Sequence, residues 1–354
     1  MLNINKTLSV LTAAVMLPSF ISVATSAAVP TDLKSGDGIV AKVIDGPTLD
    51  NTLVTADPLK SIKNSEFIVK GNMRFDGWFL KADRIIFEPG SSLVFSRTAL
   101  SNRRQFWIVA KEIVVKDANA PGVISWEKSV TPAPPSAPGE APAGPNATVD
   151  GNAGSPGNTG NSGATGYSGE NAPQITLVVT TVPTSGVTVD LTGGNGGQGG
   201  QGMKGGRGGS GAGGRVGSQG GFGCLAGAGN GGSGGAGGAG GLGGEGGVGG
   251  NGGSFLIVSE AELLPTLTQK FRVRVSSAQG GTAGQGGPGG DGGAGGRGGS
   301  ENLPYCRGNG NQGPAGPTGP AGAIGAAGQN GQEGDFTVGG VTKEQLQNYI
   351  WPSI

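Results

Sequence analysis

Two stretches in the first half of the chain are rich in apolar, strand-forming residues and resemble each other. The first covers residues 79–96, and the second starts at Trp107 and continues to residue 126. They align at a spacing of 28 residues, which matches Ala82 with Ala110. Each has a long β-rich run, a glycine turn and a short β run. A repeat of strands and turns at this period is typical of a solenoid. We predict an all-β core, either a short β-helix or a sandwich, with almost no α-helix.

Further short apolar runs interrupt the second half of the chain. Runs at 175–179, 255–259 and 336–338 start about 80 residues apart, and the first two are followed by second runs at 187–191 and 271–275. Long glycine-rich segments separate these pairs. The pattern predicts a unit of two strands, an outgoing arm, a tip and a returning arm.

The glycine-rich segments keep a strict period of three. Glycine recurs at every third residue over 151–169, 193–223, 229–253, 281–299 and 310–334. This is the period of a polyproline II helix, so one edge of each helix carries no side chain. Backbones can approach along such edges and form hydrogen bonds between helices. We therefore predict a polyglycine II bundle, with a disordered linker as the alternative.

The second residue of each triplet separates two kinds of arm. In 229–253, and nearly so in 193–214 and 281–299, two of every three residues are glycine. Two side-chain-free edges suit a helix with neighbours on two sides. Segments 154–171 and 313–334 have one glycine per triplet and are predicted to be outer helices.

Composition narrows the class of protein. The 354 residues include 78 Gly and 22 Pro, and only 5% are aromatic, so one ordinary core cannot extend over the whole chain. There is no histidine, and 24 basic residues balance 24 acidic ones. We expect no enzyme activity, no cofactor, no metal site and no nucleic-acid partner.

The N-terminus predicts export. Lys6 precedes an apolar run at 8–24, and small residues follow, with cleavage expected after Ala27 or Ala28. No later apolar run is long enough for a stable membrane span. We expect a secreted or periplasmic protein with these segments: signal peptide 1–28, β-rich domain 29–130, Pro/Ala-rich linker 131–149, glycine-rich bundle 150–340 and a short capping helix in 341–354.

The two cysteines both lie where an outgoing arm ends. Stacked arms would bring Cys224 and Cys306 to the same end of the bundle, where a disulfide would close a loop of about 82 residues. Two unpaired thiols are the alternative.

Thr342 to Gln345 form a capping box that predicts a helix through Ile350, placed over the open end of the core.

Few other residues suggest a site. Trp78, Trp107 and Trp126 are expected in the core, with a carbohydrate-stacking surface as the functional alternative. Asp76, Asp83 and Glu88 flank the first β repeat. A carboxylate site there is a weaker prediction than separate solvated charges.

Residues 151–334 resemble collagen-like secreted bacterial proteins, and also the polyglycine II bundles of snow-flea-type antifreeze proteins and phage tail-fibre tip adhesins. The resemblance rests on the glycine period alone. With the export signal, it implies a structural or adhesive protein of the cell surface or matrix, binding an extracellular surface, a polysaccharide or itself. Ice binding and phage-type receptor binding are the alternatives. The charged residues in the arms count against the ice-binding alternative: Lys204, Arg207, Arg215, Glu245, Asp291 and Arg297.

Overall fold

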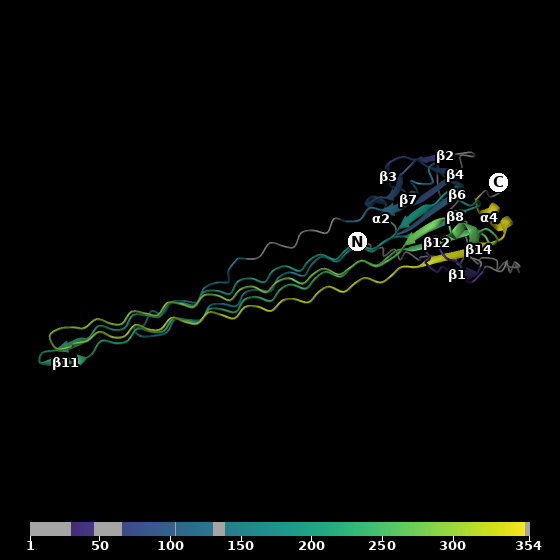
Figure 1. The fold of residues 1–354 in the computed structure, drawn as a ribbon. Helices are drawn as coiled ribbons and strands as arrows, with labels where there is room; N and C mark the ends of the chain where they lie inside the picture. Colours follow the sequence, from purple (N-terminus) through teal and green to yellow (C-terminus); the bar gives the residue numbers. More distant parts are fainter. Residues whose placement is uncertain (1–29, 46–65, 103, 130–138, 351–354) are drawn as a thin grey trace, which may run out of the picture.

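The computed structural model describes residues 30–45, 66–102, 104–129 and 139–350. The predicted signal peptide, with Ala27 and Ala28, lies outside the described residues. The described chain forms a β-rich head and a long straight rod of extended backbone that projects from it (Figure 1). A small hairpin lies at the far end of the rod.

The head contains two sheets whose strand pairs are all parallel. The seven-stranded sheet has the order β1 (Lys42–Asp45), β14 (Phe336–Val341), β12 (Ser254–Glu260), β8 (Gln174–Val179), β6 (Gln105–Val115), β4 (Phe79–Phe87) and β2 (Glu66–Val69). The five-stranded sheet has the order β13 (Phe271–Arg274), β9 (Val187–Asp190), β7 (Gly122–Trp126), β5 (Ser92–Phe95) and β3 (Asn72–Phe75). From β2 to β14 these strands alternate between the two sheets, and the all-β prediction is confirmed.

The 28-residue repeat corresponds to neighbouring strands in register. Ala82 pairs with Ala110 and Ile85 with Ile113 across β4 and β6. β6 also pairs with β8, so the strands of the predicted N-terminal domain and those of the glycine-rich region belong to one core. The predicted boundary between those two segments therefore does not divide the sheets.

The core lies between the two sheets and is built from alternate residues of each strand. Phe95 of β5 and Phe106 of β6 have ring centroids 4.5 Å apart, and Phe255 of β12 and Phe271 of β13 are 5.6 Å apart. All four side chains are fully buried. Such burial contributes roughly 1.5–3 kcal/mol for each large apolar side chain.

Among the described residues, three short helices lie on the surface of the head: α2 (Arg97–Asn102), α3 (Leu264–Thr268) and α4 (Lys343–Ile350). α4 begins with the predicted capping box. Thr342 Oγ1 accepts from the Gln345 N–H at 3.2 Å, and Gln345 Oε1 accepts from the Thr342 N–H at 2.9 Å. Leu346 is buried with Trp107 and Val258 on the outer face of the seven-stranded sheet. α4 therefore covers a sheet face, and not the open end of the core as predicted.

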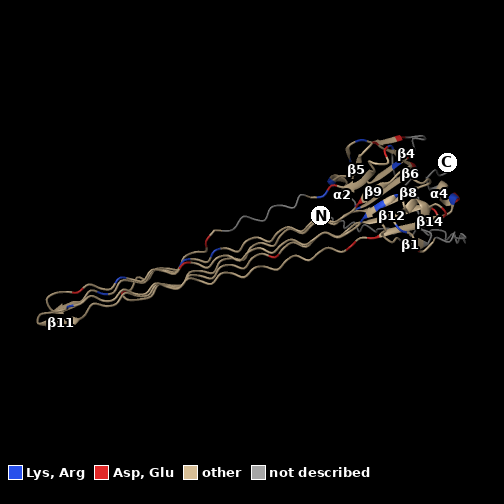
Figure 2. Cartoon of the chain, viewed as in Figure 1, with Lys and Arg blue, Asp and Glu red and all other residues tan. Residues whose placement is uncertain are grey.

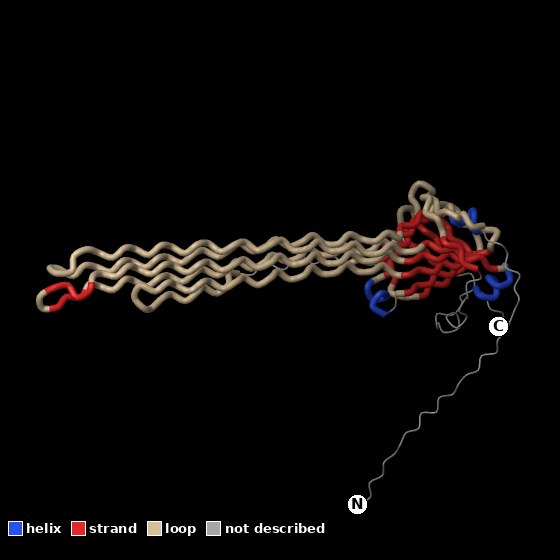
Figure 3. Tube along the Cα trace, turned by 90° about the horizontal axis from the view of Figure 1, so that it is seen from below, coloured by secondary structure: helices blue, strands red, loops and turns tan. Residues whose placement is uncertain are grey.

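The rod consists of six extended arms, numbered here in chain order: arm 1 (139–149), arm 2 (151–171), arm 3 (192–217), arm 4 (228–253), arm 5 (276–300) and arm 6 (309–334). Odd-numbered arms run away from the head and even-numbered arms return to it (Figure 1), and the arms lie side by side along the rod (Figure 3). Arms 3 and 5 follow β9 and β13 of the five-stranded sheet. Arms 2, 4 and 6 lead into β8, β12 and β14 of the seven-stranded sheet.

Backbone hydrogen bonds join the arms in two rows. Arms 1, 3 and 5 are linked in parallel in one row, and arms 2, 4 and 6 in the other. Antiparallel bonds join each arm to the next across the rows. The order of arms within each row repeats the order of the strands to which they connect. Each sheet of the head therefore continues into one row of the rod.

In the interior arms, two of three amides in a triplet are bonded to another backbone. In arm 4, the Gly237 N–H donates to Pro317 O of arm 6 at 2.9 Å, and the Gly238 N–H donates to Gly206 O of arm 3 at 2.7 Å. Carbonyls of the same triplet accept from arms 2 and 5. One triplet thus contacts four other arms.

These contacts explain the glycine pattern. A Cβ at Gly237, the first triplet position, would lie 2.0 Å from Gly290 O in the following arm. A Cβ at Gly238, the second position, would lie 1.9 Å from Asn158 O, two arms earlier. An arm needs both glycines only where both neighbours exist. Arms 2 and 6 each lack one of these neighbours and have one glycine per triplet, as the outer-arm prediction requires.

Met203 occupies a second position in arm 3 and supports this rule. A Cβ at Gly206 would lie 2.0 Å from Pro142 O of arm 1, whereas at Gly200 the nearest atom is at 3.0 Å. Among the described residues, arm 1 first bonds to arm 3 at Lys204. Met203 therefore stands just before the stretch in which a side chain is excluded.

Part of the predicted linker 131–149 belongs to the rod. Residues 130–138 lie outside the described residues, but 139–149 run along arm 3. The Gly144 N–H donates to Arg207 O at 2.7 Å, and the Ala147 N–H donates to Ser210 O at 2.9 Å. The composition predicts a semi-rigid, extended linker, and 139–149 are indeed extended but bonded to arm 3. Pro142 and Pro145 stand at positions where an amide would have no preceding arm to bond to.

Candidate binding tip

The far end of the rod is closed by two turns and a disulfide. A hairpin of β10 (Ser218–Gly220) and β11 (Gly223–Ala226) joins arms 3 and 4. A turn at 302–306 joins arms 5 and 6, with the Cys306 N–H donating to Asn302 O at 2.9 Å. Cys224 and Cys306 form the predicted disulfide, with their Cα atoms 4.8 Å apart.

Polar side chains at the tip bond to one another and to the backbone. Gln219 Nε2 donates to Asn302 Oδ1 at 3.0 Å, and Asn302 Nδ2 donates to Gly217 O at 2.9 Å. Glu301 Oε2 accepts from the Gly308 N–H at 3.1 Å. These bonds and the disulfide hold the two turns together as one unit.

Several large apolar side chains at this tip are exposed to solvent. Phe222 in the hairpin turn is 100% exposed, and Leu225 of β11 is 75% exposed. Leu303 and Tyr305 of the second turn are 58% and 49% exposed. The head has the opposite arrangement, since its largest apolar side chains are fully buried. Apolar groups left exposed together mark a surface that binds something.

The tip is also positively charged. Residues 213–229 and 297–309 contain three arginines, Arg215, Arg297 and Arg307, against Glu301, a net charge of two positive. All three arginines are exposed, and none forms an ion pair within the part of the chain that the structure describes. Charges along the arms appear in Figure 2.

The two faces of the rod differ in charge. On the outgoing row, Lys204 Nζ lies 2.9 Å from Asp291 Oδ2 and 3.6 Å from Glu140 Oε2. Its hydrogen bond to Lys204 lowers the pKa of Asp291, and the same bond raises the pKa of Lys204. On the returning row, the third positions of arm 4 between residues 233 and 251 carry one charge, Glu245.

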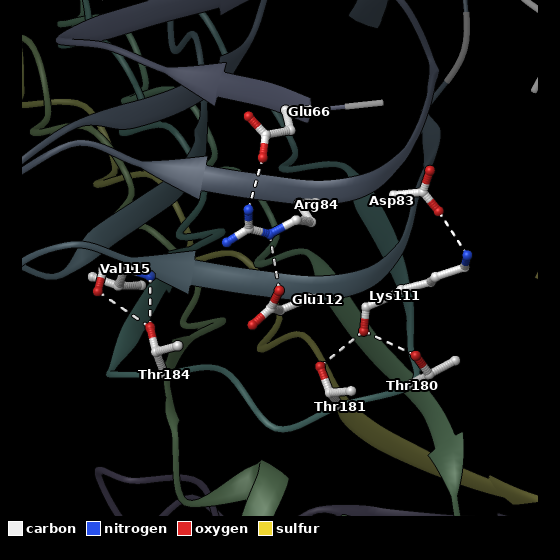
Figure 4. A network of polar contacts seen from close by, with 9 residues as sticks. All are labelled: Glu66, Asp83, Arg84, Lys111, Glu112, Val115, Thr180, Thr181 and Thr184. Atoms are coloured by element: carbon white, nitrogen blue, oxygen red, sulfur yellow. Dashed lines mark hydrogen bonds and ion pairs between the residues drawn. The ribbon is translucent and has the colours of Figure 1, made fainter. Parts of the chain in front are cut away.

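The outer face of the seven-stranded sheet carries a polar network in the head (Figure 4). Arg84 of β4 lies between Glu66 of β2 and Glu112 of β6, with N–O distances of 2.7 and 3.0 Å. The hydrogen bond to Glu112 raises the pKa of Arg84. Lys111 lies 2.8 Å from Asp83. These pairs connect neighbouring strands, and exposed pairs contribute little to stability.

The candidate carboxylates do not form one site. Asp83 pairs with Lys111, Glu88 with Lys116 at 2.8 Å, and Asp76 with Arg74 at 3.4 Å. No group of three potential metal ligands occurs within the described part of the chain. The favoured interpretation of separate solvated charges fits Asp76 and Glu88, but Asp83 is buried and not solvated.

The three candidate tryptophans, Trp78, Trp107 and Trp126, belong to the head. Trp107 and Trp126 are buried, and Trp126 Nε1 donates to Thr192 O at 3.1 Å. Trp78 is half-buried beside Phe79, with ring centroids 5.8 Å apart. The positions of Trp107 and Trp126 agree with the core interpretation, whereas Trp78 keeps part of its surface exposed. The sequence analysis missed the tip, although Phe222 and Leu225 stand out as large apolar residues between glycine arms.

No family model matches the chain, and no curated protein matches it. Among solved structures, it is similar to a nine polyproline type II helical bundle springtail antifreeze protein from Granisotoma rainieri. The identity is 26%, over 52% of this chain and 94% of that one, and the TM-score is 0.12. At that TM-score the likeness carries no argument about fold or function. Among the described residues, no helix is long and apolar enough to cross a membrane.

Proposed function

We propose that this protein is a secreted, non-enzymatic adhesive rod. Its head is a short β-solenoid, and its arms form a polyglycine II-type bundle that carries a binding tip. The observation that supports this most is the disulfide-closed tip, where Phe222 is fully exposed and Leu225, Leu303 and Tyr305 are exposed beside it at the end of a glycine-rich rod. A disulfide also suits export, because disulfides persist in oxidising compartments.

The rod acts as a spacer. Arm 3 has 26 residues, and at about 3.1 Å per residue it extends roughly 80 Å from the head. Hydrogen bonds between arms every third residue stiffen this length, whereas a free glycine chain would coil. The tip can therefore reach a surface at a distance from the head.

Binding of labelled mature protein to bacterial cells, matrix polysaccharide and immobilised copies of itself tests this function. We expect retention on at least one of these surfaces, and we expect it to fall when Phe222 and Leu225 are both replaced by serine, which leaves the Cys224–Cys306 disulfide in place. An Ile324→Ser variant, changed at a similarly exposed site midway along arm 6, is the matched control. The proposal fails if the protein is retained on none of the three.

The returning face supports a second candidate, ice binding. Arm 4 presents small or apolar side chains there, Ala236, Ala239, Leu242 and Val248, interrupted by Glu245. The other charges that count against ice binding lie in arms 3 and 5, on the outgoing row. Thermal hysteresis that disappears in an Ala239→Lys variant would favour this candidate, and its absence in the natural protein would exclude it.

A further inference from the structure

We propose that the tip docks on a membrane surface that carries anionic lipid headgroups, with Phe222 and Leu225 entering the interface between headgroups and acyl chains. This inference rests on the proposed function, because it identifies the partner of the same tip. The occupant follows from three properties of the tip: its apolar side chains, its positive charge and its internally bonded polar groups.

The position of Phe222 suits insertion into a lipid layer. Phe222 stands at the turn of the hairpin between Gly221 and Gly223, around which a Cβ would meet no atom within 4 Å. The side chain therefore projects alone from the end of the molecule, with no groove beside it. Aromatic and leucine side chains in such positions partition into the membrane interface.

The second turn widens the apolar surface. Leu303 and Tyr305 are about half exposed, and the disulfide between Cys224 and Cys306 ties their turn to the hairpin. Because the covalent link fixes the two turns together, several apolar groups can enter the interface without a further loss of conformational entropy.

The charge of the tip complements an anionic surface. Arg215, Arg297 and Arg307 are exposed, and Glu301, the one acidic residue of the tip, accepts from the Gly308 amide. Basic groups near a membrane are attracted to anionic headgroups within a Debye length. An apolar end surrounded by arginines is the arrangement that binds such a surface from one side.

A polysaccharide partner fits the tip less well. Side-chain amides and carboxylates are common ligands of sugars, and those of Gln219, Asn302 and Glu301 at the tip already bond internally. Gln219 bonds to Asn302, and Asn309 Oδ1 accepts from the Glu301 N–H at 2.8 Å. These bonded groups would have to be released from their internal partners before they could recognise a glycan. Binding to a lipid interface requires only the side chains that are already exposed.

Co-flotation of the oxidised mature protein with vesicles tests the proposal. One set of vesicles contains phosphatidylglycerol and phosphatidylcholine at 3:7, and the other contains phosphatidylcholine alone. We expect binding to the first set, weakened at least tenfold by Phe222→Ser with Leu225→Ser, and weakened by salt or by Arg215→Gln with Arg307→Gln. Ile324→Ser, on arm 6, should bind as the natural protein does.

Three outcomes overturn the proposal. These are no binding to phosphatidylglycerol vesicles, equal binding to neutral vesicles, and binding that the double serine variant leaves unchanged. Circular dichroism of each variant confirms that the rod is intact. Retention on polysaccharide or on immobilised copies without vesicle binding would refute the lipid partner and leave the adhesive function standing.

Discussion

The head and the rod are stabilised by opposite means. The head buries large side chains such as Phe95, Phe106 and Phe255 between two sheets, as most globular proteins do. The rod excludes side chains from its interior and bonds backbone to backbone in two directions. Each bond contributes only about 1 kcal/mol net, and glycine loses much entropy on folding. The rod therefore depends for its stability on what holds its two ends, namely the sheets of the head and the disulfide at the tip.

Loss of the disulfide should have the largest effect on the rod. The chain-entropy model for a loop of 82 residues gives about 4–5 kcal/mol of stabilisation. Cys224→Ala with Cys306→Ala should therefore lower the melting temperature of the polyproline II signal in circular dichroism. Tryptophan fluorescence from the head should change much less. Equal melting of the rod in both proteins would show that the sheets alone hold the arms.

A cavity in the head should be nearly as costly, and it tests how far the rod depends on the sheets. Phe255 lies against Phe271 and Phe336 at the entry of arm 4 into β12, so Phe255→Ala should cost about 3–5 kcal/mol. Denaturant unfolding followed by tryptophan fluorescence measures this loss. We expect the polyproline II signal to disappear in the same transition. Survival of that signal after the head unfolds would make the rod independent.

A side chain inside the rod should have a smaller and more local effect. Gly238→Val places carbon atoms against Asn158 O and should cost about 1–3 kcal/mol by overpacking. Ala239→Val, at the neighbouring third position, is the control and should be nearly neutral. Thermal melting of the polyproline II signal compares the two variants. If Gly238→Val melts like Ala239→Val, the close approach of the arms is wrong.

The smallest effect concerns the charges on the outgoing face. Lys204 depresses the pKa of Asp291, so the pair contributes stability above the unfolded carboxyl pKa and loses it as pH falls through the lower folded value. Lys204→Met should return the pKa of Asp291 toward its ordinary value. An NMR titration of the Asp291 carboxyl carbon measures this. An unchanged titration would mean that the two side chains do not meet.

Much of the rod could be predicted from the sequence, because glycine occurs at the positions where a neighbouring backbone leaves no room for a side chain. Positions such as Gly237 and Gly238 carry no side chain where a neighbour approaches, and the one-glycine arms lack a neighbour. Proline follows the same logic, since Pro314 and Pro317 occupy third positions, whose amides have no backbone partner in the described arms. The pairing of Ala82 with Ala110 could also be predicted, because the two strands that pair have similar sequences at a spacing of 28 residues.

Other features could not be predicted because their signals are ambiguous. Leu346 marks an apolar helix face, but whether α4 covers a sheet face or the end of the core depends on which surface the strands leave uncovered. The segment 139–149 reads as a linker by composition, and only its neighbours make it an arm. Phe222 lies in a turn and belongs to no periodic pattern. That it lies near Leu303 and Tyr305 follows only from the stacking of the arms and the disulfide.

Residue-resolved amide exchange of the oxidised protein tests the central claim most directly. In arm 4 we predict a repeating pattern in which two of three amides are protected, for example Gly237 and Gly238 but not Ala239. In arm 6 the glycine amides, such as Gly316, should be protected, together with those of Asn311 and Gln332, which donate to asparagine side chains of arm 4. Fast exchange at every residue of these arms would contradict the account, since no backbone packing of the kind described would then hold the rod together.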